Sequence, residues 1–220
     1  MTPDTLDFLQ RFSLQPLPQL PSAYPPITFK APVRHAAVLL ALEPSPNGLQ
    51  LLLTQRSAQM PTHPGEIAFP GGKVEADDQS PWHAAAREAW EEIGLPTSHL
   101  QQVGQLSALH TRTGFYVFPF VALITKPFQP IVSKREVERL FRVPLLDFSD
   151  HQRRRRITIK RRQQWHPIYL MHHNIWGATA AIIEQLMQLL GYQAAREHPE
   201  PSRFSLAAHG NHKRVIGASE

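Results

Sequence analysis

The chain has 220 residues, a formal net charge of +5 from 23 Lys and Arg against 18 Asp and Glu, and no cysteine. The lack of cysteine excludes disulfide scaffolds, thiol nucleophiles and cysteine-ligated zinc or iron–sulfur sites, so any metal must be bound by oxygen or imidazole. With no apolar run near the roughly 20 residues that span a bilayer and no secretory signal, we expect a soluble cytoplasmic protein without a membrane partner.

The first 32 residues form a proline-rich arm, in which prolines at positions 16, 18, 21, 25 and 26 allow at most a short helical turn near residues 6–12. The domain proper is expected over residues 33–190. It opens with two apolar runs, 35–43 and 49–54, joined by Pro-Asn-Gly, which predicts two strands connected by a turn.

The best-marked helix follows a glycine loop and ends just before Gly94. Ser80 can cap it, Pro81 suits its first position, and Ala84 to Ala86 favour a helical interior. Strands are predicted at 103–109, 115–124, 157–160 and 168–170, with a short helix near 135–141. A last helix over about 175–190 has apolar residues at helical spacing, and residues 191–220 are expected to be a loose tail.

Three carboxylates fall on one side of the capped helix. Glu88, Glu91 and Glu92 occupy positions i, i+3 and i+4, which face the same way. Like charges so arranged repel one another and call for a cation, and clustered oxygen ligands favour Mg²⁺ or Mn²⁺ over zinc.

A solvated acidic face is the ordinary alternative for such a cluster. The segment before the helix favours the metal site instead, because Phe69-Pro70-Gly71-Gly72-Lys73 is a tight glycine loop that leads shortly into the acidic helix. Glycines let the backbone approach a ligand closely, and a carbonyl there can supply one more oxygen.

These residues resemble the Nudix box, whose pattern is G-x5-E-x7-R-E-U-x-E-E-x-G-U with U an aliphatic residue. The matching positions are Gly72, Asp78, Arg87, Glu88, Glu91, Glu92, Gly94 and Leu95. Asp78 stands where the box usually has Glu, eight residues rather than seven separate it from Arg87, and Ala89 replaces a larger aliphatic residue. The extra residue precedes Arg87, so it leaves the spacing of the carboxylates unchanged.

The flanking segments resemble the coenzyme A pyrophosphatase branch of that superfamily. Residues 53–57 and 65–72 look like the signature of this branch, although Pro61 stands where an arginine is usual. Residues 118–121, 136–137, 143–145 and 175–180 are also similar, so the resemblance covers about residues 33–190.

The resemblance implies an α/β/α sandwich with a mixed β-sheet and a magnesium- or manganese-dependent diphosphatase. Glu88 and Glu92 are expected to bind metal, Glu91 to share in binding or to accept a proton from water, and Arg87 to orient a carboxylate. The Gly71 carbonyl is expected to complete the metal shell. The sequence does not divide the roles among the three glutamates.

The substrate expected from this branch is coenzyme A or acyl-coenzyme A, with 3′,5′-ADP and 4′-phosphopantetheine as products. Arg56 is the candidate partner of the 3′-phosphate, and His63 and Gly72 are further candidate substrate contacts. Pro61 keeps a second diphosphate substrate open, such as NADH or ADP-ribose. A catalytically silent module that binds nucleotide or RNA is a third alternative, against which the intact glutamate set argues.

The basic run from Arg153 to Arg162 could bind nucleic acid, but alternation of Ile157 and Ile159 with polar residues favours a half-buried strand with solvated arginines. A small-molecule partner is therefore expected, and a homodimer is left open. Glu136 could furnish a late carboxylate, although its predicted position makes an ordinary helix-start residue the simpler interpretation.

Overall fold

The computed structural model describes residues 2–14, 33–111, 113–161 and 164–201. Its main sheet is mixed, because β1 (Arg34–Ser45) runs parallel to β7 (Phe115–Ile124) and antiparallel to β2 (Gly48–Arg56). The central strand order is β3-β2-β1-β7-β5, and β4, β6 and β8 pair with β1, β7 and β2. These other strands are β3 (Ile67–Ala68), β4 (Gly71–Lys73), β5 (Leu100–Gln105), β6 (Leu109–His110) and β8 (Val137–Pro144).

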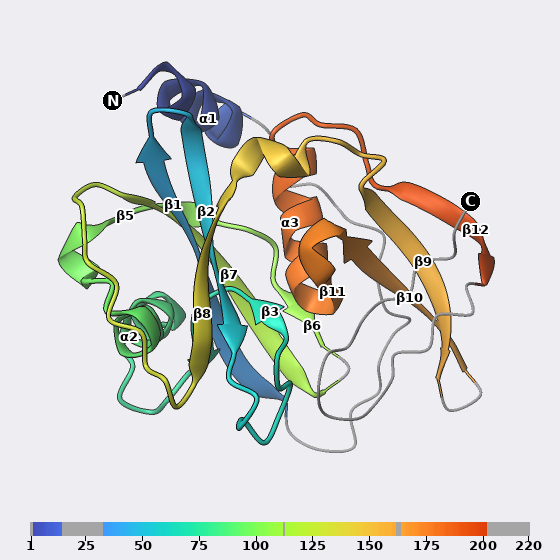
Figure 1. Cartoon of the computed structure of the whole chain (residues 1–220), viewed down its shortest axis with the longest axis horizontal. Helices are drawn as coiled ribbons and strands as arrows, with labels where there is room; N and C mark the ends of the chain where they lie inside the picture. Colours follow the sequence, from blue (N-terminus) through green and yellow to red (C-terminus); the bar gives the residue numbers. More distant parts are fainter. Residues whose placement is uncertain (1, 15–32, 112, 162–163, 202–220) are drawn as a thin grey trace.

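Helices cover both faces of this sheet (Figure 1). Helix α2 (Pro81–Ile93) packs through its alanines on one face, which includes Leu39 and Leu52. Helix α3 (Gly177–Leu189) packs on the other face, which includes Leu40 and Leu51. Successive strand residues thus point into opposite cores. The result is the expected α/β/α sandwich with a mixed sheet.

A second sheet lies beyond α3 (Figure 1). Its strands run in the order β11 (Ile175–Trp176), β10 (Gln164–Met171), β9 (Arg154–Arg161) and β12 (Arg196–Pro201). Helix α3 thus lies between the main sheet and the second sheet, and most of its residues are buried. Short 3₁₀ turns, η1 (Thr97–His99), η2 (Leu145–Phe148) and η3 (His172–Asn174), complete the described elements.

The glycine segment is inserted between β1 and β2 at one end of the main sheet. One half of β1 pairs with β2, as Leu42 does with Leu51, whereas the other half pairs with β4, as Ala37 does with Gly72. The Leu39 N–H donates to the Pro70 carbonyl at 2.9 Å between the two halves. The β2 strand ends at this same end of the sheet, so the glycines and Arg56 are brought together under α2.

The predicted caps of α2 are present. The Ser80 side chain accepts a hydrogen bond from the His83 N–H, and Gly94 adopts the left-handed conformation with φ 70°. The strand at 115–124 agrees with β7, and the predicted hairpin agrees with β1 and β2. The predicted helix at 135–141 is wrong: a turn leads there into β8, a strand that pairs with β2 and packs Phe141 and Val143 in the core on the α3 side.

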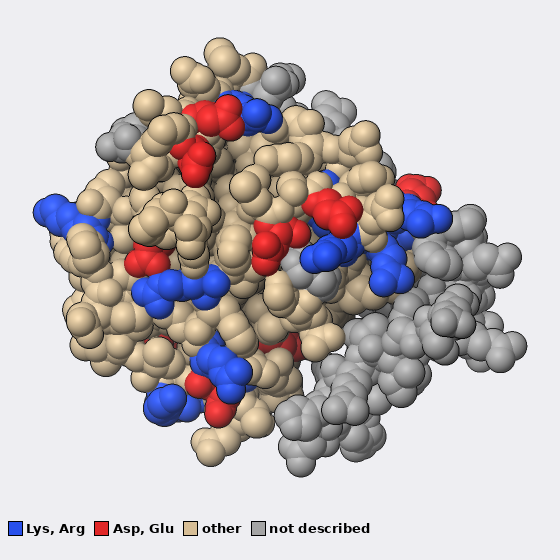
Figure 2. Space-filling model, turned by 45° about the horizontal axis from the view of Figure 1, so that its top comes forward, with Lys and Arg blue, Asp and Glu red and all other residues tan. Residues whose placement is uncertain are grey.

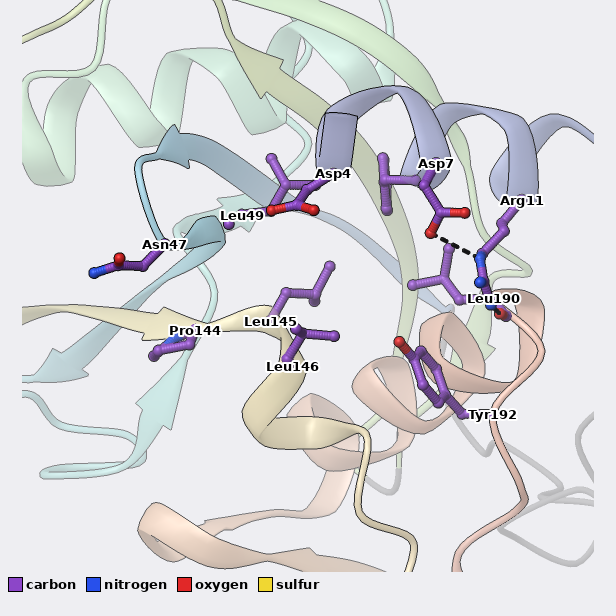
Figure 3. Close-up of a pocket in the computed structure, with 12 residues that line it drawn as sticks. Asp4, Asp7, Arg11, Asn47, Leu49, Pro144, Leu145, Leu146, Leu190 and Tyr192 are labelled. Atoms are coloured by element: carbon purple, nitrogen blue, oxygen red, sulfur yellow. Dashed lines mark hydrogen bonds and ion pairs between the residues drawn. The ribbon is translucent and has the colours of Figure 1, made fainter. Parts of the chain in front are cut away.

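Helix α1 (Pro3–Leu14) lies over the opposite end of the sheet, beside the β1–β2 turn. Its Phe8 is buried in the core on the α3 side, and Phe12 packs over Gly104, where a side chain would collide with the ring. A cavity of about 170 Å³ opens between α1, the β1–β2 turn, Leu145 and Tyr192 (Figure 3). No helix among the described residues is long and apolar enough to cross a membrane.

Candidate metal centre

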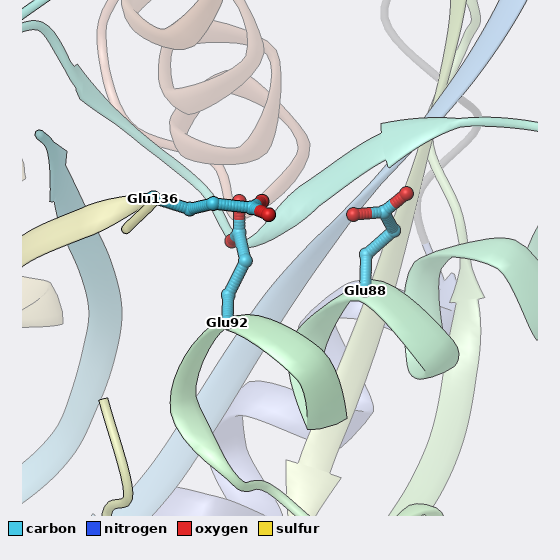
Figure 4. Close-up of side chains that lie close together, drawn as sticks. All are labelled: Glu88, Glu92 and Glu136. Atoms are coloured by element: carbon cyan, nitrogen blue, oxygen red, sulfur yellow. The ribbon is translucent and has the colours of Figure 1, made fainter. Parts of the chain in front are cut away.

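Three carboxylates meet at the end of the sheet that holds the glycine segment. Glu88 and Glu92 come from α2, and Glu136 comes from the turn just before β8 (Figure 4). One oxygen of each lies within 4.8 Å of the others. We call Glu88, Glu92 and Glu136 the carboxylate trio.

The glycine segment, Gly71 and Gly72, leaves room for the carboxylates of the trio. A Cβ on Gly72 would fall well inside van der Waals contact with the Glu88 carboxylate, and one on Gly71 would collide with the Ala37 carbonyl. Gly71 also has φ 152°, a conformation that side chains rarely adopt, and its N–H donates to Glu92 Oε2 at 3.3 Å. Glycine at position 71 therefore lets β4 lie against β1, and glycine at position 72 leaves room for the Glu88 carboxylate.

Main-chain hydrogen bonds fix Glu136 opposite α2. Its N–H donates to the Ser133 carbonyl at 3.0 Å, and the Ser133 N–H donates to the Glu92 carbonyl at 2.9 Å. Its own carbonyl accepts from the Ser57 N–H at 2.8 Å, just after β2 ends. Sequence reasoning favours an ordinary helix-start residue for Glu136, because the pairing that makes this segment the approach to a strand is not local.

Burial makes the trio electrostatically costly without a cation. Glu92 is only 3% exposed, and its burial, together with the nearby Glu88 charge, raises its pKa to about 8. Burial also raises the pKa of Glu88, although Arg87 opposes the shift. Buried like charges destabilise a fold unless they take up protons or bind a cation. An all-oxygen donor set fits a hard divalent ion such as Mg²⁺ or Mn²⁺.

Arg87 connects α2 to the loop that precedes this helix. Its guanidinium donates to both Asp78 oxygens at 3.0 Å and to the Lys73 carbonyl at 3.1 Å. It also donates to Glu88 at 3.1 Å and to Glu91 at 3.2 Å. The hydrogen bond from Arg87 lowers the pKa of Asp78. Asp78 thus occupies the position of the usual box glutamate and holds Arg87 across the longer loop.

Glu91 lies at the edge of the trio and shares the Arg87 guanidinium with Glu88. Its side chain is 53% exposed and its recorded partner is Arg87. Among the described residues, Glu91 is not part of the group whose oxygens lie within 4.8 Å of one another. The contact that Gly71 makes with the trio runs through its N–H rather than its carbonyl.

The two remaining candidate side chains differ in their relation to the trio. Arg56 ends β2, and its charge acts on Glu92, whose pKa it lowers against the larger effect of burial. His63 lies in the loop that follows β2, and its Nδ1 contacts Glu66 at 2.8 Å while about half of the side chain stays exposed. Arg56 therefore belongs to the surroundings of the trio, whereas the contact recorded for His63 lies within its own loop.

Three arginines of the basic run are paired with acidic residues of the chain. Arg154 is fully buried and pairs with Glu184 at 2.5 Å, so the expectation that these arginines are solvated is wrong for this residue. Arg153 pairs with Asp150 and Arg156 with Glu197. Figure 2 shows basic and acidic residues interspersed on the face that it draws. The side chains of residues 158–163 lie outside the described part.

A family model and two similar proteins agree on one family. A family model of the NUDIX domain matches residues 33–167. A protein of Photorhabdus laumondii named "Uncharacterized Nudix hydrolase NudL" is 39% identical over 187 residues, which cover 83% of this chain and 95% of that protein. A protein of Pectobacterium atrosepticum with the same name is 40% identical, over 82% of this chain and 91% of that protein.

Similar solved structures include a Nudix hydrolase from M. smegmatis, RenU. It is 26% identical, with a TM-score of 0.45, and the match covers 55% of this chain and 76% of that one.

Proposed function

Since this chain belongs to the Nudix family, we propose that it is a divalent-metal-dependent diphosphatase that hydrolyses coenzyme A or acyl-coenzyme A. Water adds its oxygen to one phosphorus, the bond from that phosphorus to the bridging oxygen breaks, and two phosphate monoesters and two protons result. The products are 3′,5′-ADP and 4′-phosphopantetheine, acylated or free.

One observation carries the proposal: three carboxylates whose oxygens lie within 4.8 Å of one another face a glycine turn, and one of them is almost wholly buried. In the proposed centre, Glu88, Glu92 and Glu136 hold the cation. When bound, Mg²⁺ supplies positive charge to the phosphate oxygens and makes a water more acidic. Glu92 and Glu88 must be ionised to bind it, so the site competes with protons for its metal.

The other residues act around this set. Arg87, anchored by Asp78, orients Glu88 and joins the middle of α2 to β4 through the Lys73 carbonyl. Glu91, which is paired with Arg87 beside Glu88, is the proposed acceptor of the water proton. Gly71 and Gly72 let the diphosphate approach the backbone, with the Gly71 carbonyl as a further oxygen ligand, and His63 is proposed to contact the substrate beyond the diphosphate.

A second substrate class is supported by Pro61, which removes the arginine usual in the coenzyme A branch. Without this arginine, another nucleoside diphosphate derivative such as NADH or ADP-ribose is the alternative substrate.

The assay is a product analysis. Purified protein with Mg²⁺ is given coenzyme A, NADH, ADP-ribose or a nucleoside triphosphate, and the products are separated. The proposal expects 3′,5′-ADP from coenzyme A at the highest kcat/KM. If coenzyme A stays intact while NADH or ADP-ribose is consumed, the substrate is wrong and the chemistry stands. If no compound is consumed with Mg²⁺ or Mn²⁺, the chain is a binding module and the proposed activity fails.

A further inference from the structure

Arg56 is held in place by main-chain hydrogen bonds on both sides. Its N–H donates to the Glu66 carbonyl at 2.9 Å, and its carbonyl accepts from the Gly65 N–H at 3.0 Å, which closes the intervening loop. The next residue, Ser57, donates its N–H to the carbonyl of Glu136. Arg56 is thus only one residue from a direct hydrogen bond to a member of the carboxylate trio.

The side chain of Arg56 lies on the same face of the sheet as the trio. Leu52, four residues earlier on β2, packs with the alanines of α2, and Leu51 and Leu53 pack in the opposite core. Because strand residues alternate, positions 52, 54 and 56 share the face that α2 covers. The influence of the Arg56 charge on Glu92 agrees with this placement.

The guanidinium has spare hydrogen-bonding capacity at this position. The Arg56 Nε is inaccessible to solvent and has no hydrogen-bond partner among the described residues. A buried donor without an acceptor is destabilising and rare in folded proteins, so such a group calls for an explanation. An arginine fork matches the oxygens of a phosphate, which can accept two of its N–H groups together.

We propose that Arg56 binds a non-bridging oxygen of the scissile diphosphate at the metal centre, rather than a distant phosphate of the substrate. This deepens the proposed function and rests on it. The charge of Arg56 lies where negative charge grows on the phosphate oxygens during hydrolysis, so Arg56 stabilises the transition state as well as the bound substrate. The role differs from the contact with the 3′-phosphate that the sequence suggested.

Two substrates separate these roles, because dephospho-coenzyme A lacks the 3′-phosphate but has the same diphosphate. With Arg56→Gln, kcat is expected to fall about 100-fold for both substrates alike. Arg56→Lys, which keeps the charge but loses the fork, should recover part of the loss. The matched control is Arg139→Gln: Arg139 is exposed on β8 beside Gln55, so removal of its charge should change kcat less than about twofold.

The inference fails if Arg56→Gln raises KM for coenzyme A only and leaves dephospho-coenzyme A unchanged, because Arg56 then serves the 3′-phosphate. A calorimetric titration with Mg²⁺ and the non-hydrolysable diphosphate α,β-methylene-ADP tests the contact without turnover. The expected result is affinity weakened at least about tenfold by Arg56→Gln.

The titration also separates failure of the inference from failure of the proposed function. A wild-type protein that hydrolyses nothing, yet binds the analogue in an Arg56-dependent way, supports the inference and refutes the activity. Equal binding by wild type and Arg56→Gln, or no binding by the wild type, overturns the inference. Thermal unfolding of each variant shows that the protein is folded, and Arg56→Lys serves as the test if Arg56→Gln is not.

Discussion

Glu136 is the residue whose role depends most on the folded structure. It lies 44 positions after Glu92, yet its carboxylate lies within 4.8 Å of Glu88 and Glu92, on the side of the site opposite α2. Glu136 is the member of the trio that comes from outside α2, so an ion held there has ligands from two elements. Glu136 is therefore expected to matter as much as either helix carboxylate.

Replacing Glu136 by Gln should lower Mg²⁺-dependent kcat/KM at least about tenfold, close to 1.4 kcal/mol of transition-state stabilisation. Glu138→Gln is the control, since Glu138 is exposed two residues further along β8. Steady-state kinetics with the preferred diphosphate measures both variants. Equal activity of Glu136→Gln and Glu138→Gln would remove Glu136 from the metal centre.

The raised pKa of Glu92 sets a pH dependence for the metal-free protein. Its pKa is about 8 in the folded state against an ordinary value of 4.5, so between these values the folded state binds a proton that the unfolded state releases. The free energy of unfolding must then fall as pH rises from about 5 to about 8. Thermal unfolding in EDTA across this range should show the fall, and Glu92→Gln should reduce it. A variant with the same pH profile as the wild type contradicts the assignment.

Among the contacts between elements, the position of the Glu88 carboxylate of α2 against β4 depends on Gly72. Alanine there should displace the Glu88 carboxylate, because the nearest atoms to the added methyl group all belong to that carboxylate. Since the obstructing atoms end a flexible side chain, the melting temperature should change little while turnover falls at least about tenfold.

Gly191→Ala is the opposite control for this prediction. Gly191 has φ 85° and open space around it, so alanine there strains the backbone without a collision. That variant should lose stability and keep its turnover. Wild-type turnover in Gly72→Ala would show that Glu88 does not need this space.

The elements that could be predicted are those with local signals. Helix α2 has a capping serine, an N-terminal proline and a left-handed glycine at its end, so both limits could be read from the sequence. The sequence predicts a helix where β8 begins because this short charged segment has no local marker of a strand, which forms only by pairing with β2. The place of Glu136 at the metal centre depends on the same pairing.

On the scale of the whole molecule, the second sheet is held to α3 by a buried ion pair. Arg154 and Glu184 are both fully buried; Arg154 also donates to the carbonyl of Gln193, and Glu184 accepts from Gln188 and from the Ala195 N–H. This network joins β9, α3 and the segment that leads to β12. A buried ion pair is costly to break from one side only.

Glu184→Leu should therefore lower the free energy of unfolding by about 3–5 kcal/mol, because it leaves the Arg154 charge buried and unpaired. The double variant Arg154→Met/Glu184→Leu should recover much of this loss, since it removes both charges and keeps the volume. Urea denaturation of the three proteins measures the effect. A single variant as stable as the wild type, or a double variant no more stable than the single one, contradicts this role of the pair.

The overall architecture was predictable only through the resemblance of a short motif to a family. The strands of the second sheet illustrate the limit: parts of β9 and β10 were expected, but nothing local indicates that they form a separate sheet behind α3. Strand β12 contains Pro199 and Pro201, which argue against a strand in sequence, and it forms at an edge by pairing with β9. Burial of Arg154 likewise depends on Glu184, which is 30 residues away.

Calorimetric titration of the metal-free protein with Mn²⁺ shows whether the carboxylate trio binds a divalent ion, at a pH above about 8 where Glu92 is ionised. The wild type is expected to bind Mn²⁺, Glu92→Gln to weaken this binding at least about tenfold, and Glu138→Gln to leave it unchanged. Mn²⁺ binding of equal strength in the wild type and in Glu92→Gln would contradict metal binding by the trio.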